Sequence, residues 1–194
     1  MKLSRPEPLL FALQDLVVDM ALIERNHHLA GHERAESDVD HSFAVAMLCW
    51  YICDKYALPL DQAKVLKYAL IHDFTEKYVG DINTYADKAA RDKKVEQEKE
   101  ALKRLEQDFH GFDDLTRSLR GYDAQTDEEA LFVWTVDKMQ AIILGEMDDW
   151  RPYKKVGVTY EQFVAKHSGQ LAKSSPYCKE IFSAILEYSK SLLQ

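Results

Sequence analysis

The chain has 194 residues, 46% of them hydrophobic and 30% charged, which is the profile of a globular protein with one hydrophobic core. Its formal net charge of −8 repels phosphate backbones and argues against a protein that coats nucleic acid. With only 7 glycines and 5 prolines, long helices are favoured over a sandwich of short strands. We therefore expect an all-α fold in a single domain, residues 1–194, with no nucleic-acid partner.

The three cysteines form neither a metal-ligand motif nor an even disulfide framework; they are Cys49, Cys53 and Cys178. The first apolar stretch carries Asp15 and Asp19, unlike a signal peptide. No run reaches the roughly 18 apolar residues that a membrane helix needs. We expect a reduced, cytoplasmic protein without a membrane partner.

Helical periodicity dominates the first half of the chain. A first helix is predicted from Leu9 to about Arg25, followed by a polar loop over residues 26–40. A second helix is expected over about residues 41–56, before Pro59, and a third from residue 60 or 61 to Asp73. A short turn or helix should follow through Val79.

The second half of the chain also reads as helices and connections. The predicted segments are a charged helix at 87–109, a looser stretch at 111–121, a helix at 127–147, a connection at 150–158, and helices at 160–172 and 177–193. The sequence TDEE, residues 126–129, is a good capping sequence with acidic residues in the first helical turn. No segment shows strand alternation.

Imidazole and carboxylate side chains interrupt the apolar stripes of three predicted helices: His41, His72, Asp73 and Asp137. Glu76 returns to the face of His72 if that helix continues. A lone histidine in such a stripe is usually a satisfied core or capping residue, and a lone aspartate can equally form a buried pair with Lys or Arg. Taken together, two imidazole nitrogens and two carboxylates suit one divalent metal ion with positions left for water or substrate.

Three blocks carry this pattern: RAESDVDHS (34–42), HDFTEKYVGDINT (72–84) and DEEALFVWTVD (127–137). Their order, H…HD…D, resembles the HD-domain superfamily of metal-dependent phosphohydrolases, and most closely the branch that contains 5'-deoxynucleotidases. The resemblance implies a helical bundle with a motif core over about residues 25–145 and C-terminal helices, residues 160–193, packed on it. It also implies hydrolysis of a small-molecule nucleotide, most simply a nucleoside 5'-monophosphate. Relatives of this size commonly pair as homodimers, which makes a homodimer one possible partner arrangement.

The resemblance implies a role for each matching residue. The metal ligands would be His41, His72, Asp73 and Asp137, holding one divalent ion (Mn, Co, Mg, Zn, Ni or Fe). Glu76 and Asp81 would be the catalytic carboxylates. Arg25, with Arg34 as competitor, would orient the phosphate. The remaining substrate contacts would come from Asn26 and from the segment Asp81, Ile82, Asn83 and Thr84.

The sequence departs from this branch at two places that shape the sugar and base pocket. Asn26 replaces an aromatic residue that often follows the phosphate-orienting arginine, and Asn83 and Tyr85 stand where the branch tends to have proline. Selectivity for deoxyribose is therefore left open by the sequence.

Other activities remain as alternatives. The same family hydrolyses nucleoside triphosphates, cyclic nucleotides or alarmones, and a di-iron oxidase would need further histidines, for which His27, His28 and His32 are candidates in a solvated loop. A non-catalytic scaffold with the same fold is the alternative from a different class. Trp150 or Tyr153, if exposed, could form a homodimer surface or could equally be the ordinary surface aromatics of a monomer.

Overall fold

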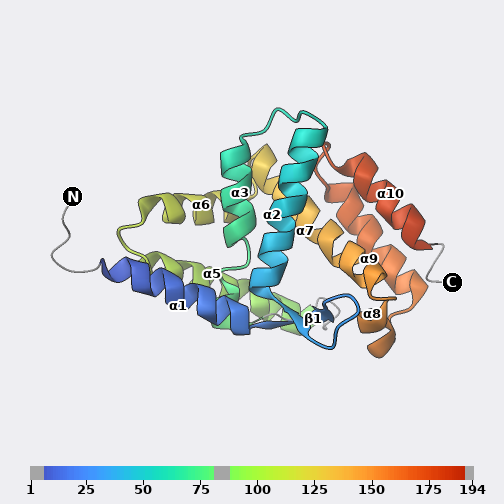
Figure 1. The fold of residues 1–194 in the computed structure, drawn as a ribbon, viewed down its shortest axis with the longest axis horizontal. Helices are drawn as coiled ribbons and strands as arrows, with labels where there is room; N and C mark the ends of the chain where they lie inside the picture. Colours follow the sequence, from blue (N-terminus) through green and yellow to red (C-terminus); the bar gives the residue numbers. More distant parts are fainter. Residues whose placement is uncertain (1–6, 81–87, 191–194) are drawn as a thin grey trace.

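Most residues are helical in the computed structural model, which describes residues 7–80 and 88–190 (Figure 1). In chain order the elements are α1 (Pro8–Leu22), β1 (Glu24–His28), β2 (Ala35–Ser37), α2 (Asp38–Lys55), α3 (Gln62–Ile71), α4 (Glu76–Val79), α5 (Lys88–Asp108), α6 (Asp113–Ala124), α7 (Glu128–Met147), α8 (Arg151–Lys155), α9 (Tyr160–Lys173) and α10 (Lys179–Lys190). The predicted helical fold is confirmed, with a short β-hairpin in addition.

The hairpin replaces the loop that was predicted for residues 26–40. Strands β1 and β2 pair antiparallel, with Glu24 opposite Ser37 and His28 opposite Ala35, and the register is irregular between these pairs. The strands are short and polar, so they carry no alternation that the sequence could reveal. The first helix also ends three residues early, at Leu22, which places Arg25 on β1.

Local capping explains where the site-bearing helices begin. At the start of α2 the Ser37 hydroxyl accepts a hydrogen bond from the Asp40 amide, and the Asp40 carboxylate accepts one from the Ser37 amide. This capping box starts α2 at Asp38, three residues before the predicted start. At α7 the carboxylate of Asp127 accepts a hydrogen bond from the Ala130 amide at 2.8 Å.

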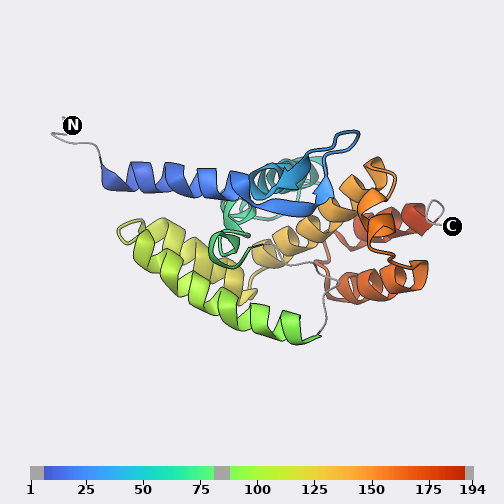
Figure 2. The same cartoon turned by 90° about the horizontal axis from the view of Figure 1, so that it is seen from below.

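Helices α2, α3 and α7 pack against one another around the core. Six residues of α7 are completely buried: Ala130, Phe132, Val133, Thr135, Val136 and Ile142. Figure 2 shows α5 and α6 side by side toward one end of the molecule, while α8, α9 and α10 gather at the other end. Because α7 is buried on most of its circumference, a polar side chain in its middle must find a partner inside the protein.

Two segments predicted as irregular are helical. Residues 113–124 form α6, and residues 151–155 form α8. Trp150 and Tyr153 are only 1% and 5% exposed, so the expectation that they form a partner surface is wrong. Both rings contact Phe163 of α9, and a Cβ atom at Gly145 would lie 2.8 Å from the Tyr153 ring. The lack of a side chain at Gly145 therefore lets α8 pack closely on α7.

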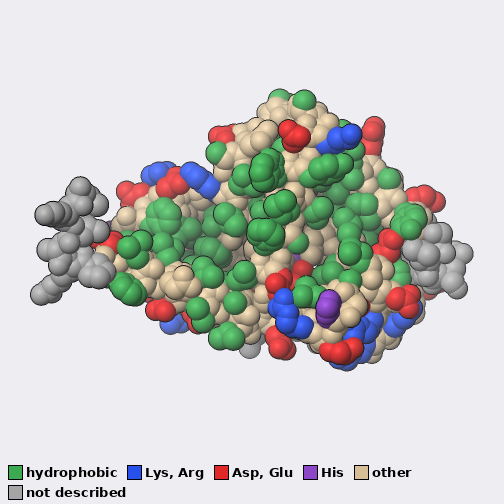
Figure 3. Space-filling view, viewed as in Figure 1, with side chains coloured by type: hydrophobic (Ala, Val, Ile, Leu, Met, Phe, Trp, Pro, Cys, Tyr) green, Lys and Arg blue, Asp and Glu red, His purple; other side chains and the backbone are tan. Residues whose placement is uncertain are grey.

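Large apolar side chains are exposed elsewhere, on the face seen in Figure 3. On α2 the exposed apolar side chains are Phe43 (64% exposed), Met47 (46%), Trp50 (55%) and Tyr51 (62%). The homodimer stays a prediction. Among the described residues, none of the helices combines the length and the apolar character needed to cross a membrane.

Candidate metal centre

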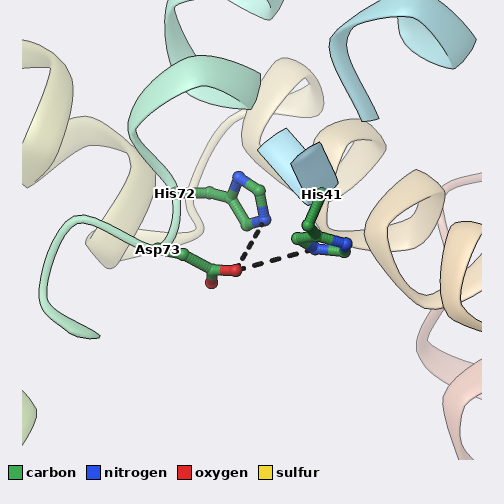
Figure 4. A group of neighbouring side chains, drawn as sticks. All are labelled: His41, His72 and Asp73. Carbon is green, nitrogen blue, oxygen red and sulfur yellow. Dashed lines mark ion pairs between the residues drawn. The ribbon is translucent and has the colours of Figure 1, made fainter. Parts of the chain in front are cut away.

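The four predicted metal ligands come from three helices and lie together in the core. His41 is in the first turn of α2, His72 and Asp73 follow the end of α3, and Asp137 is in the middle of α7. The Nε2 atom of His41 is 3.1 Å from Oδ1 of Asp137 and 3.6 Å from Oδ2 of Asp73. The Nε2 atom of His72 is 3.2 Å from the same Asp73 oxygen, and Figure 4 shows both rings directed at it.

Hydrogen bonds on the far side of each ring fix the tautomers. Nδ1 of His41 lies 2.9 Å from Oε1 of Gln140, and because an amide oxygen only accepts, this ring nitrogen donates. The amide nitrogen of Gln140 donates to Oε1 of Glu36 at 2.7 Å, which holds the amide in this orientation. Nδ1 of His72 donates to the carbonyl of Ala69 at 2.8 Å. In the neutral form of each ring, Nε2 therefore carries a lone pair toward the centre.

The Nε2 atom of His41 thus lies close to carboxylate oxygens of both Asp73 and Asp137, and that of His72 lies close to Asp73. Acceptors that converge in a buried space repel one another unless a cation or protons lie between them. Metal-binding histidines in proteins usually donate their second N–H to a carbonyl or carboxylate, as both rings do here. The nitrogen and oxygen donors fit a divalent first-row metal ion. His41, His72 and Asp73 form one group of mutually close potential ligands, and Asp38, Asp73 and Glu76 form another.

Arg25 lies at the edge of this cluster. Its Nη1 atom donates to Oδ2 of Asp73 at 2.8 Å and to Oδ1 of Asp38 at 2.9 Å, and it is 4.0 Å from Oε2 of Glu76. Arg34, the competing candidate, instead binds Asp40 on the surface. The geometry therefore places Arg25 and Glu76 beside the cluster and Arg34 away from it.

The charges of the cluster stabilise each other. Burial by itself raises the pKa of Asp73, but the neighbouring His72 and Arg25 outweigh this and hold it well below its usual range. For His72, burial lowers the pKa, yet the Asp73 charge is stronger and the net direction is upward. Asp137 also faces a cation, since Nζ of Lys138 is 2.5 Å from its Oδ2 atom. Asp137 therefore has both an ion pair with Lys138 and a second oxygen directed at His41.

Three buried residues of the cluster were missed in the sequence: Glu36, Asp38 and Gln140. Gln140 stands three positions after Asp137, a helical spacing that puts both on one face and could have indicated it. Glu36 and Asp38 lie in the polar block before His41, where nothing distinguishes them from surface acids. The predicted residues Asp81, Ile82, Asn83 and Thr84 lie outside the described residues.

A cavity of about 310 Å³ opens beside the cluster, between β1, α7, α8 and α9. Arg25, Asn26 and Asp137 line one end of it. His27 and His28 line it as well, so the expectation that they lie in a solvated loop is wrong. Within the described part of the chain, neither candidate metal group includes them or His32. The cavity is at the small end of the range of ligand pockets.

A family model described as HD domain matches residues 22–179 of this chain, more than half of its length. The chain belongs to the HD domain family. The matched range includes His41, His72, Asp73 and Asp137. The predicted family resemblance is confirmed.

Curated relatives of this chain include the Bos taurus protein named 5'-deoxynucleotidase HDDC2. The two sequences are 32% identical over 115 residues, a match that covers 57% of this chain and 53% of the relative. The Xenopus laevis protein of the same name is 27% identical over 165 residues, covering 83% and 77%. The chain thus spans only about half the length of the first of these relatives.

Two solved structures have the same fold. One, from Magnetospirillum magnetotacticum MS-1, is named a predicted metal-dependent phosphohydrolase; it matches with a TM-score of 0.76 at 23% identity and 96% coverage of both chains. The other, a conserved hypothetical protein from Pyrococcus furiosus, matches with a TM-score of 0.62 at 25% identity, covering 90% of this chain and 98% of that one. The shared fold covers at least 90% of this chain in both comparisons.

Proposed function

We propose that the protein is a metal-dependent phosphohydrolase that converts nucleoside 5'-monophosphates, deoxynucleotides first among them, into nucleoside and inorganic phosphate. The observation that carries the proposal is the convergence of two imidazole lone pairs and two carboxylates beside an arginine, at one end of a cavity. The names of the curated relatives, 5'-deoxynucleotidases, support the substrate class.

In this proposal His41, His72, Asp73 and Asp137 hold one divalent metal ion. Such an ion, when bound, supplies Lewis-acid stabilisation of the charge on the phosphoryl group. The candidate ions are Mn, Co, Mg, Zn, Ni and Fe. The substrate is a small-molecule nucleotide, and the site of action is cytoplasmic.

Arg25 and Glu76 have different roles. Arg25 is fixed by Asp38 and Asp73, so its guanidinium is positioned to bind phosphate oxygens without first losing side-chain freedom. Glu76 is 5% exposed and faces the same cluster, where its carboxylate orients a water molecule and accepts its proton. Asp81 either protonates the leaving 5'-oxygen or holds the sugar.

The proposal is tested by a turnover screen of nucleoside mono-, di- and triphosphates and cyclic nucleotides, in ribo and deoxy forms, with each candidate metal. We expect phosphate release to be fastest from deoxynucleoside monophosphates. Faster turnover of a triphosphate or a cyclic nucleotide would replace the proposed substrate with that class. No turnover of any substrate with any metal would favour the scaffold alternative.

Single substitutions test the site itself. Asp137→Asn should lower metal affinity and turnover by at least about 100-fold, because it removes a buried anionic ligand. Asp149→Asn is the matched control, since the Asp149 side chain is 94% exposed. Glu76→Ala should keep the metal and lose most of kcat. Loss of the metal in Glu76→Ala would instead make Glu76 a ligand.

A further inference from the structure

The cavity continues well beyond the metal cluster. From Arg25 and Asp137 it extends past Ala141, one helical turn further along α7, to Tyr153 and Val156 of the α8 region and to α9. A phosphate bound at the cluster would fill only its near end. The far end therefore offers room for another part of the same ligand.

The far wall combines aromatic rings with the lysine side chains of Lys155 and Lys166. The ring of His27 packs edge-on against Tyr153, with ring centres 5.5 Å apart, and the ring of His167 lies 4.3 Å from that of Phe163. Burial lowers the pKa of both histidines to about 4, with Arg25 adding to the effect for His27 and Lys166 for His167. Both rings are therefore neutral at pH 7.

His167 presents a buried polar atom that lacks a partner. The residue is 3% exposed, and its Nδ1 atom donates to Oε1 of Gln170 at 2.6 Å. This leaves Nε2 as an acceptor, and within the described residues it has no hydrogen bond. An unsatisfied buried acceptor costs about 1–3 kcal/mol, and His167 is one of the residues that line the cavity.

We propose that the part of the cavity between β1, α8 and α9 is a nucleobase subsite, in which His167 and Gln170 bind the polar edge of the base. The inference rests on the proposed nucleotidase function, because a phosphate bound at the metal cluster would leave the base of the same nucleotide at the far end of the cavity. A base is flat and apolar on its faces, as the aromatic wall requires, and it carries donors and acceptors on its edge. Lys138, Lys155 and Lys166 also line the cavity and complement the negative charge of a nucleotide.

The first test compares a deoxynucleoside 5'-monophosphate with 2-deoxyribose 5-phosphate, which has the same reacting group and no base. We expect the wild-type KM to be about tenfold lower for the nucleotide, within the range that stacking of one base on aromatic side chains provides. Equal KM values for the two substrates would overturn the subsite. If neither substrate is turned over, the proposed function fails, and calorimetric binding of the free nucleoside against 2-deoxyribose still decides the subsite.

Substitutions test its location. Val156→Trp places a bulky ring in the lining of the cavity, at a side chain that is already 52% exposed, so it tests the cavity without disturbing the core. We expect it, and His167→Phe, to raise the ratio of the nucleotide KM to the sugar-phosphate KM about tenfold. Ser168→Ala, at an exposed neighbouring position outside the cavity, should leave the ratio unchanged. An unchanged ratio in Val156→Trp would place the base elsewhere. A lower KM for a nucleoside diphosphate that is lost in Lys166→Gln would assign the space to a second phosphate instead.

Discussion

Gln140 provides the sharpest test of how the site is built. It is 5% exposed, accepts the Nδ1 proton of His41 at 2.9 Å and donates to Glu36 at 2.7 Å. Gln140→Met keeps the length and approximate volume of the side chain but removes both hydrogen bonds. His41 then loses the partner that holds its Nε2 lone pair toward Asp73 and Asp137.

The structure sets the expected size of the effect. Loss of a partner that orients a metal-binding histidine typically costs 10–100-fold in metal affinity, equivalent to about 1.4–2.7 kcal/mol. The metal-free protein should also lose about 2 kcal/mol of stability, because the N–H of His41 is left buried without an acceptor. For a chain of this length that corresponds to a fall in Tm of about 4–8 °C.

The assay is calorimetric titration of the metal-free protein with Mn²⁺ or Co²⁺, together with kcat/KM at saturating metal. Gln14→Met, at an exposed position of α1, is the matched control and should behave as wild type. The reasoning would be refuted if Gln140→Met lowered Tm as expected but bound metal and turned over substrate within twofold of wild type. Gln140 would then only stabilise the fold.

Three further predictions concern stability. Phe132→Ala should lower the free energy of unfolding by about 3–5 kcal/mol in urea titrations, whereas Phe43→Ala, at a 64% exposed position, should cost under about 1 kcal/mol; similar losses would contradict the assigned core. Ser37→Ala removes the capping box of α2 and should cost about 1 kcal/mol by the same measurement, while no change would show that the cap is dispensable. Burial lowers the pKa of His167 from 6.5 in the unfolded chain to about 4 in the folded protein, so the free energy of unfolding should fall as pH drops from 6.5 to 4. His167→Phe should reduce this pH dependence by about 3 kcal/mol. An unaltered profile would show that His167 is not titrating as assigned.

The helices of this protein could be predicted well because their signals are local. Apolar residues at helical spacing and capping residues such as Asp127 act within one or two turns, so a short window of sequence contains them. The misses have the opposite character. Strands β1 and β2 are short and polar, and they exist because they pair with each other. Trp150 looked like a surface aromatic because the residues that cover it, Phe163 among them, lie on another helix.

For the candidate site, the sequence by itself determined which side chains were out of place: a histidine or an aspartate in an apolar stripe must find a partner inside the protein. Only the tertiary structure decided that these partners are each other. His41 and Asp137 are separated by 96 positions, and they meet because α2 and α7 pack across the core. Packing likewise set the His41 tautomer through Gln140 and formed the cavity wall from α8 and α9. Contacts between distant segments depend on how whole helices fit together, and no local pattern of residues contains that information.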